Sequence, residues 1–199
     1  DNAMSEYPTS SVPRIAMLSE AQALERGRQQ GIDDYISRMN LFRVLLHRPA
    51  LAGQLNGTIM ALVGGEKVLG DRLRELIIMR VSWLTGCDYE WVQHWQASLY
   101  FGLTASELAA VRDWRDAPVF DSQERAALAA TDELVQTGAI GPECWRALSA
   151  EVDDQSLLEV VACIANWHMF AQLLRALEVP LEPGLASWPP DGKAPVGSA

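Results

Sequence analysis

The sequence has few basic residues for its length. Its 199 residues include 16 Lys and Arg against 26 Asp and Glu, which gives a formal net charge of −10 and a pI near 4.7. Nucleic acids and anionic membrane surfaces are bound through clusters of positive charge, for which such a chain gives little basis. We therefore expect neither nucleic acid nor membrane among its partners.

An uninterrupted apolar run long enough to cross a membrane is also missing. The longest apolar stretch, from Leu157 to Leu177, is broken by the polar residues Glu159, Asn166, His168, Gln172 and Arg175. A spanning helix needs about 20 almost uninterrupted apolar residues, so we interpret this stretch as a buried helix. The chain does not open on a basic region followed by an apolar run, and we expect no secretory signal and a cytoplasmic location.

Cysteine and histidine are scarce, with 3 of each. Three cysteines at irregular positions do not suit a disulfide framework, which fits a reducing compartment. No second histidine stands at ligand spacing from His94, so we expect neither a metal nor a cofactor, although Glu75, Glu90 and His94 together imitate a carboxylate-rich metal site.

Proline marks both ends of the chain. We expect residues 1–18 to form an extended N-terminal arm, and residues 1–3 before Met4 look like an expression remnant. We expect residues 180–199 to form a Pro-rich tail. Both are expected to lie over the surface or on a neighbouring subunit. Between them, residues 19–179 carry apolar residues at spacings of three and four without sustained alternation, which predicts one all-α domain.

Start and stop signals predict about eight helices in that domain. The first four span about 33–47, 49–64, 70–85 and 87–101, and Gly102 follows the last in the position of a left-handed cap. Thr104 with Glu107, and Asp121 with Glu124, have capping-box spacing and open two more. Another begins at Pro142, and the last runs from residue 153 or 154 to about 176.

The segment TGCDYEWVQH, residues 85–94, places Cys87, Glu90 and His94 on one predicted helix. At about 100° per residue these positions fall within about 60° of one another, so the thiol, the carboxyl and the imidazole share a face. The free amides of a helix start are expected to lower the pKa of Cys87. Cys87 is then a candidate nucleophile or proton donor.

Glu75 lies in the preceding predicted helix, inside the apolar run from Leu73 to Val81. A carboxylate in such a run has to be paired, be neutral or take part in chemistry. The short link at residues 85–86 folds the two helices antiparallel, which is able to bring Glu75 toward Glu90 or His94.

Three runs, LRELIIMR at 73–80, TGCDYEWVQH at 85–94 and GLTASE at 102–107, resemble the core of the carboxymuconolactone decarboxylase and AhpD-like superfamily. Similarity extends more loosely from about 39 to 183. The resemblance implies an AhpD-like helical fold in which Glu75, Cys87 and His94 match the Glu, the first Cys and the His of a proton relay. Glu90 stands where AhpD-like proteins have their second Cys, so their dithiol cycle cannot run within this helix.

The leading hypothesis is a small-molecule enzyme in which Glu75 and His94 relay protons, Glu90 is an acid or base, and Cys87 is a donor or nucleophile. The resemblance implies decarboxylation or isomerisation of a carboxylated, lactone-like compound. One alternative is thiol-dependent, peroxiredoxin-type reduction of hydroperoxides through a sulfenic acid at Cys87 that an outside thiol resolves. Another is a non-catalytic helical binding or assembly protein. The resemblance also implies a homo-oligomer, a trimer or a hexamer.

Each of the four residues also has a purely structural interpretation. Cys87 is then a small buried hydrophobe, and Glu90 with His94 forms a solvated ion pair. Glu75 pairs with Arg72 or Arg80 at a subunit contact.

Other residues of interest are more often structural. Cys144 and Cys163 are expected to serve packing, although either is a candidate to resolve an oxidised Cys87. The tryptophans at helical positions are candidates for the wall of an apolar pocket or for core and interface, namely Trp83, Trp91, Trp95 and Trp167.

Overall fold

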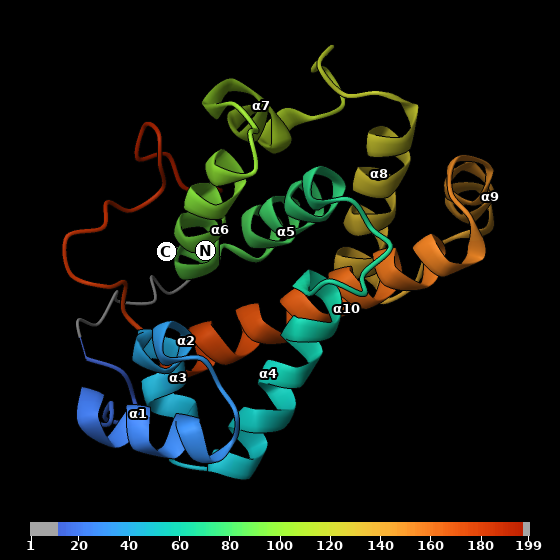
Figure 1. The fold of residues 1–199 in the computed structure, drawn as a ribbon. Coiled ribbons are helices and arrows are strands. Elements are labelled where there is room, and N and C mark those ends of the chain that lie inside the picture. Colours follow the sequence, from blue (N-terminus) through green and yellow to red (C-terminus); the bar gives the residue numbers. More distant parts are fainter. Residues whose placement is uncertain (1–11, 197–199) are drawn as a thin grey trace.

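The computed structural model describes residues 12–196, and this range is all-helical, as predicted (Figure 1). It contains ten α-helices and one 3₁₀ turn, Val111–Asp113. The α-helices are α1 (Glu20–Gln29), α2 (Asp34–Arg38), α3 (Asn40–Leu45), α4 (Pro49–Val63), α5 (Asp71–Thr85), α6 (Asp88–Tyr100), α7 (Ala105–Ala110), α8 (Ser122–Thr137), α9 (Pro142–Glu151) and α10 (Asp154–Leu177).

Two helices more than expected are present at the N-terminal end. Helix α1 is opened by a capping box between Ser19 and Gln22, a spacing that the sequence prediction overlooked. The helix predicted over 33–47 is divided at Met39, whose ψ of 139° is extended. The carboxylate of Glu182 accepts the backbone N–H of Asn40 at 3.0 Å, so a residue 142 positions away satisfies the start of α3.

The other predicted helix ends are confirmed. Gly86 closes α5 with a φ of 64°, and Gly102 follows α6 with a φ of 89°, both in the left-handed region that favours glycine. The predicted capping boxes of Thr104 with Glu107 and of Asp121 with Glu124 are both formed.

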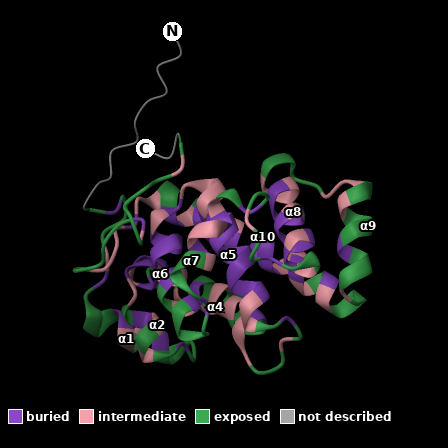
Figure 2. Ribbon diagram, turned by 90° about the horizontal axis from the view of Figure 1, so that it is seen from above, coloured by how far each residue is buried: buried purple, intermediate pink, exposed green. Residues whose placement is uncertain are grey.

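Helix α5 occupies the centre of the domain and packs against α6, α8 and α10 (Figure 1). All ten residues from Leu73 to Ser82 are buried, because neighbours cover this helix on every side. Figure 2 shows the same burial concentrated in α5, α8 and α10, while the outer face of α9 is exposed. Any polar side chain in this part of α5 must therefore find its partners inside the protein.

Helix α10 is confirmed as a core helix. Among the described residues it alone is long and apolar enough to cross a membrane by length and composition, yet half of that apolar window is buried in the protein. Its buried residues join two core clusters, Phe170 and Leu174 in one and Val160 and Ile164 in the other.

The Pro-rich tail runs back over its own chain as far as residue 196. Trp188 is buried with its ring 5.8 Å from those of Trp83 and Trp91, and the indole N–H of Trp91 donates to the carbonyl of Pro189 at 2.9 Å. At the other end, Arg14 pairs with Glu178 at 2.8 Å. The suspected remnant at 1–3 lies outside the described residues.

Candidate functional site

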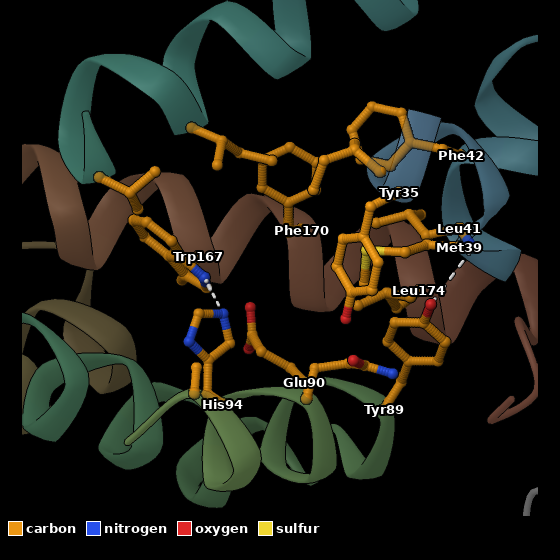
Figure 3. Close-up of a pocket in the computed structure, with 15 residues that line it drawn as sticks. Tyr35, Met39, Leu41, Phe42, Tyr89, Glu90, His94, Trp167, Phe170 and Leu174 are labelled. Carbon is orange, nitrogen blue, oxygen red and sulfur yellow. Dashed lines mark hydrogen bonds between the residues drawn. The ribbon is translucent and has the colours of Figure 1, made fainter. Parts of the chain in front are cut away.

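A cavity of about 230 Å³ lies between α2, α3, α4, α6 and α10 (Figure 3). Apolar and aromatic side chains form most of its wall. The lining residues are Tyr35, Ile36, Met39, Leu41, Phe42, Ile59, Val63, Tyr89, Glu90, Gln93, His94, Ala97, Trp167, Phe170 and Leu174. In this described part of the chain no Lys or Arg lines the cavity, and Glu90 and His94 are its carboxyl and imidazole groups.

The antiparallel packing of α5 and α6 brings Glu75 to His94, one of the two partners that the sequence left open. Nδ1 of His94 lies 2.8 Å from Oε2 of Glu75, and the other oxygen of Glu75 accepts from Arg74 at 2.9 and 3.1 Å. Burial raises the pKa of Glu75, but His94 and Arg74 lower it further, so its pKa lies below the ordinary value of 4.5. Glu75 is therefore an ionised, buried carboxylate.

The second ring nitrogen of His94 shows which tautomer is present. The indole N–H of Trp167 donates to Nε2 of His94 at 2.8 Å (Figure 3). Because an indole nitrogen only donates, Nε2 carries the lone pair and Nδ1 carries the hydrogen that Glu75 accepts. A base held by a carboxylate in this way is the arrangement that positions histidine in many hydrolases.

Glu90 occupies the opposite electrostatic environment. It is 3% exposed, its Oε2 lies 3.2 Å from Oγ of Ser82, and its Oε1 has no hydrogen-bond partner among the described residues. Burial raises the pKa of Glu90 well above 4.5. Two glutamates of one site are thus set apart, because the surroundings lower the pKa of Glu75 and raise that of Glu90.

Cys87 does not face this cavity, and the predicted lowering of its pKa is wrong. Burial of the thiol, which is 1% exposed, raises its pKa well above 9, and the carboxyl of Glu90 adds to the rise. The backbone amide of Glu90 does lower it, as a helix start should, but by less. Cys87 is the N-cap of α6 with extended backbone angles, so the 100° rule does not align it with Glu90 and His94. It lines a separate, open groove of about 970 Å³.

The structural alternatives are partly corrected. The solvated ion pair of Glu90 with His94 is wrong, because Glu90 is buried and His94 binds Glu75. Arg72 pairs with Glu107 and Glu124 and Arg80 pairs with Asp132, so neither is the partner of Glu75.

Of the candidate pocket tryptophans, only Trp167 lines the cavity, while Trp83, Trp91 and Trp95 pack in a core cluster. Cys163 is a buried core residue, as predicted, and Cys144 packs beside the same cluster. Within residues 12–196 no group of three or more His, Cys, Asp and Glu side chains is placed to hold a metal ion.

Three functional contacts escaped the sequence analysis. Arg74 holds Glu75, Ser82 contacts Glu90, and the Trp167 indole bonds His94. Ser82 precedes Glu90 by eight residues and lies on a different helix. This spacing predicts no contact until α5 and α6 are packed together. Trp167 comes from α10, and no local pattern links it to α6.

Comparison with known sequences found a family match over residues 49–133. This segment matches the carboxymuconolactone decarboxylase family and includes α4, α5, α6 and the four predicted site residues. The uncharacterized protein YnjA of Escherichia coli is 32% identical over 80 residues, which are 40% of this chain and 44% of that protein. The alignment thus spans less than half of the relative's length.

Comparison with solved structures bears on the fold. An uncharacterized peroxidase-related protein of Ralstonia eutropha with an AhpD core has a TM-score of 0.71 at 17% identity, over 89% of this chain and 95% of that one. A putative antioxidant defence protein AhpD of Agrobacterium tumefaciens has a TM-score of 0.64 at 22% sequence identity, over 68% of this chain and 93% of that one. The debrominase Bmp8 has a TM-score of 0.67 at 18% sequence identity, over 82% of this chain and 86% of that one. The fold is therefore AhpD-like.

Proposed function

We propose that this chain, which matches the carboxymuconolactone decarboxylase family over residues 49–133, is an enzyme that moves protons on a small molecule bound beside Glu90 and His94. The carrying observation is the arrangement of the two glutamates. Glu75 holds His94 as a base, while Glu90 presents an unpartnered oxygen to the same apolar cavity. Both are features of sites that perform acid and base chemistry.

The reaction that suits this site is isomerisation by a single base. Nε2 of His94 takes a proton from one carbon of an unsaturated substrate, the double bond shifts, and the imidazolium returns the proton to another carbon. Ionised Glu75 stabilises the imidazolium, as the buried carboxylate of a catalytic triad does. Trp167 must release Nε2 for this step, and Glu90 holds the substrate rather than receiving its proton.

Decarboxylation, the other reaction implied by the resemblance, has less support. A substrate carboxylate would be carried into an apolar space, and in the described structure no Lys or Arg lines that space. Hydroperoxide reduction also has less support, because Cys87 is buried, lies outside the cavity and has a raised pKa. In this proposal Cys87 serves packing.

Hydrogen exchange tests the proposal directly. Uncharged β,γ-unsaturated lactones and cyclic ketones that carry one hydroxyl group are incubated with the protein in D₂O, and loss of the acidic C–H signal is followed by NMR. We expect His94→Asn to slow the catalysed exchange by about 10²-fold or more, the usual contribution of a positioned base. Glu143→Gln on the exposed face of α9 is the matched control. Equal exchange by wild type and His94→Asn would rule the base out.

We further propose that the protein forms a homo-oligomer, a trimer or a hexamer, and that it works in the cytoplasm. The apolar helix α4 supports the first point, because among its 15 residues only Ala52 and Leu62 are buried and Leu51 and Met60 are about half exposed. Three free cysteines support the second, since the cytoplasm keeps thiols reduced.

A further inference from the structure

Ser82 determines which oxygen of Glu90 carries the proton. Its Oγ lies 2.8 Å from the carbonyl oxygen of Ile78 and 3.2 Å from Oε2 of Glu90. A hydroxyl has one hydrogen and a carbonyl only accepts, so the hydrogen of Ser82 lies in the shorter contact. Oγ of Ser82 remains an acceptor, and a protonated Glu90 satisfies it by donating from Oε2.

Oε1 of Glu90 is then left as an acceptor beside the cavity. It is buried and has no partner within residues 12–196. Figure 3 shows the carboxyl of Glu90 pointing into the cavity between His94 and Tyr35. A buried acceptor without a hydrogen bond costs free energy, which a donating ligand recovers.

The other polar groups deep in the wall are already engaged. Both ring nitrogens of His94 have partners, Trp167 and Glu75. The hydroxyl of Tyr89 and the amide of Gln93 donate to Glu182. Among the buried polar atoms of this wall, Oε1 of Glu90 is the one without a partner in the described residues, and the hydroxyl of Tyr35 also points into the cavity (Figure 3).

We infer that the cavity binds an uncharged, ring-sized apolar compound that donates one N–H or O–H hydrogen bond to Oε1 of Glu90. An apolar cavity of about 150 Å³ holds benzene, so the 230 Å³ found here accommodates one substituted ring. An anion would meet the lone pairs of Oε1 with no Lys or Arg in the described lining to offset them. This inference rests on the proposed function, because it names the substrate class of the same cavity.

Matched ring compounds test the inference without any turnover. Calorimetry compares the binding of 4-methylphenol, which donates one O–H, with that of 4-methylanisole, whose methyl ether removes the donor, and with 4-methylbenzoate, an anion. We expect wild type to bind the phenol about fivefold more tightly than the anisole, as one net hydrogen bond provides. The benzoate should bind most weakly of the three.

Two substitutions at one position separate the hydrogen bond from packing. Glu90→Gln keeps the arrangement, because its amide N–H donates to Ser82 and its oxygen still faces the cavity, so the fivefold preference should persist. Glu90→Leu removes the acceptor without leaving a large gap, so the two neutral rings should bind equally. Glu143→Gln serves as the control, and melting temperatures show that each variant is folded.

Several outcomes would overturn the inference. They are tighter binding of the benzoate than of the phenol, a preference that survives in Glu90→Leu, and binding of no ring compound by wild type. The proposed function fails separately: if no proton exchange occurs in any substrate while the phenol preference depends on Glu90, the binding inference stands and the isomerase proposal falls.

Discussion

Nδ1 of His94 lies 2.8 Å from the buried carboxylate of Glu75, a contact between two helices that pack side by side in the core. On the other side of the ring, Nε2 accepts the indole N–H of Trp167. The imidazole is thus fixed from α5 and from α10 at once, with one tautomer and one orientation. A base held this firmly loses little entropy when a substrate binds beside it.

Loss of the Glu75 charge should destabilise the protein strongly. Arg74 is 1% exposed, and in Glu75→Ala its guanidinium keeps only the half-exposed Asp71 as an ionic partner. Removing one member of a buried pair typically costs about 3 kcal/mol or more, because a charge is left uncompensated. Urea denaturation measures the change. Asp34→Asn, which breaks an exposed pair with Arg28, should leave the midpoint nearly unchanged, and equal midpoints for both variants would contradict the prediction.

The raised pKa of Glu90 predicts how stability depends on pH. Between about 4.5 and the higher folded value, the folded protein keeps a proton that the unfolded chain has lost. The contribution of this group to the free energy of unfolding is therefore complete below pH 4.5. Between pH 4.5 and the folded-state pKa it falls by about 1.4 kcal/mol per pH unit. Glu90→Gln lacks this loss, so its advantage over wild type should grow from pH 5 to pH 8.

Glu75 provides the control for this measurement. Its pKa is lowered, so its contribution is present above 4.5 and is lost as the pH falls below that value. The two glutamates thus act in different pH ranges. Unfolding free energies of wild type and Glu90→Gln that run parallel from pH 5 to pH 8 would show that Glu90 is ionised in the folded protein.

Alkylation should label Cys144 before the other two thiols. Cys87 and Cys163 are buried with pKa values raised well above 9, whereas Cys144 is half-buried and its pKa is raised less strongly. This differs from the expectation from sequence, in which a lowered pKa made Cys87 a candidate nucleophile. Brief treatment of the folded protein with iodoacetamide, followed by mass mapping, gives the order. First labelling at Cys87 would return the thiol-dependent alternative to consideration.

Glu182 should fasten the tail to α3 and α6. Its carboxylate accepts from Tyr89, Gln93 and the backbone N–H of Asn40. In Glu182→Ala the amides of α3 should exchange hydrogen faster, because the start of that helix loses its cap, at a cost of about 1 to 2 kcal/mol. Hydrogen exchange with mass spectrometry follows peptides of α3 and of the tail. Unchanged protection of α3 would show that the tail does not support it.

The exposed side of α4 predicts self-association. Sedimentation velocity at micromolar concentration should give a mass of three or six chains, and Met60→Glu should lower that mass by placing a charge on the apolar face. Thr137→Glu on α8, which is exposed elsewhere, is the control. A stable wild-type monomer would refute the oligomer.

The sequence by itself determined most of the helices and narrowed the partner of Glu75 to two residues. Capping pairs, Pro49 at a helix start and glycines at helix ends are local signals, because each satisfies free backbone groups within one turn. The apolar setting of Glu75 and the short link before α6 also predicted a contact with Glu90 or His94, since an antiparallel pair leaves a buried carboxylate few other partners, and the structure shows that the partner is His94.

Tertiary structure alone decided the chemical state of the site. Whether Glu90 is protonated depends on complete burial and on Ser82, and whether Cys87 is reactive depends on which side of α6 is covered. Trp167 bonds His94, which lies 73 positions earlier in the chain. The helix start that follows the division at Met39 is bonded by Glu182, which lies 142 positions after Asn40. Desolvation and long-range hydrogen bonds arise only when distant segments meet, and for that reason no local pattern of residues encodes them.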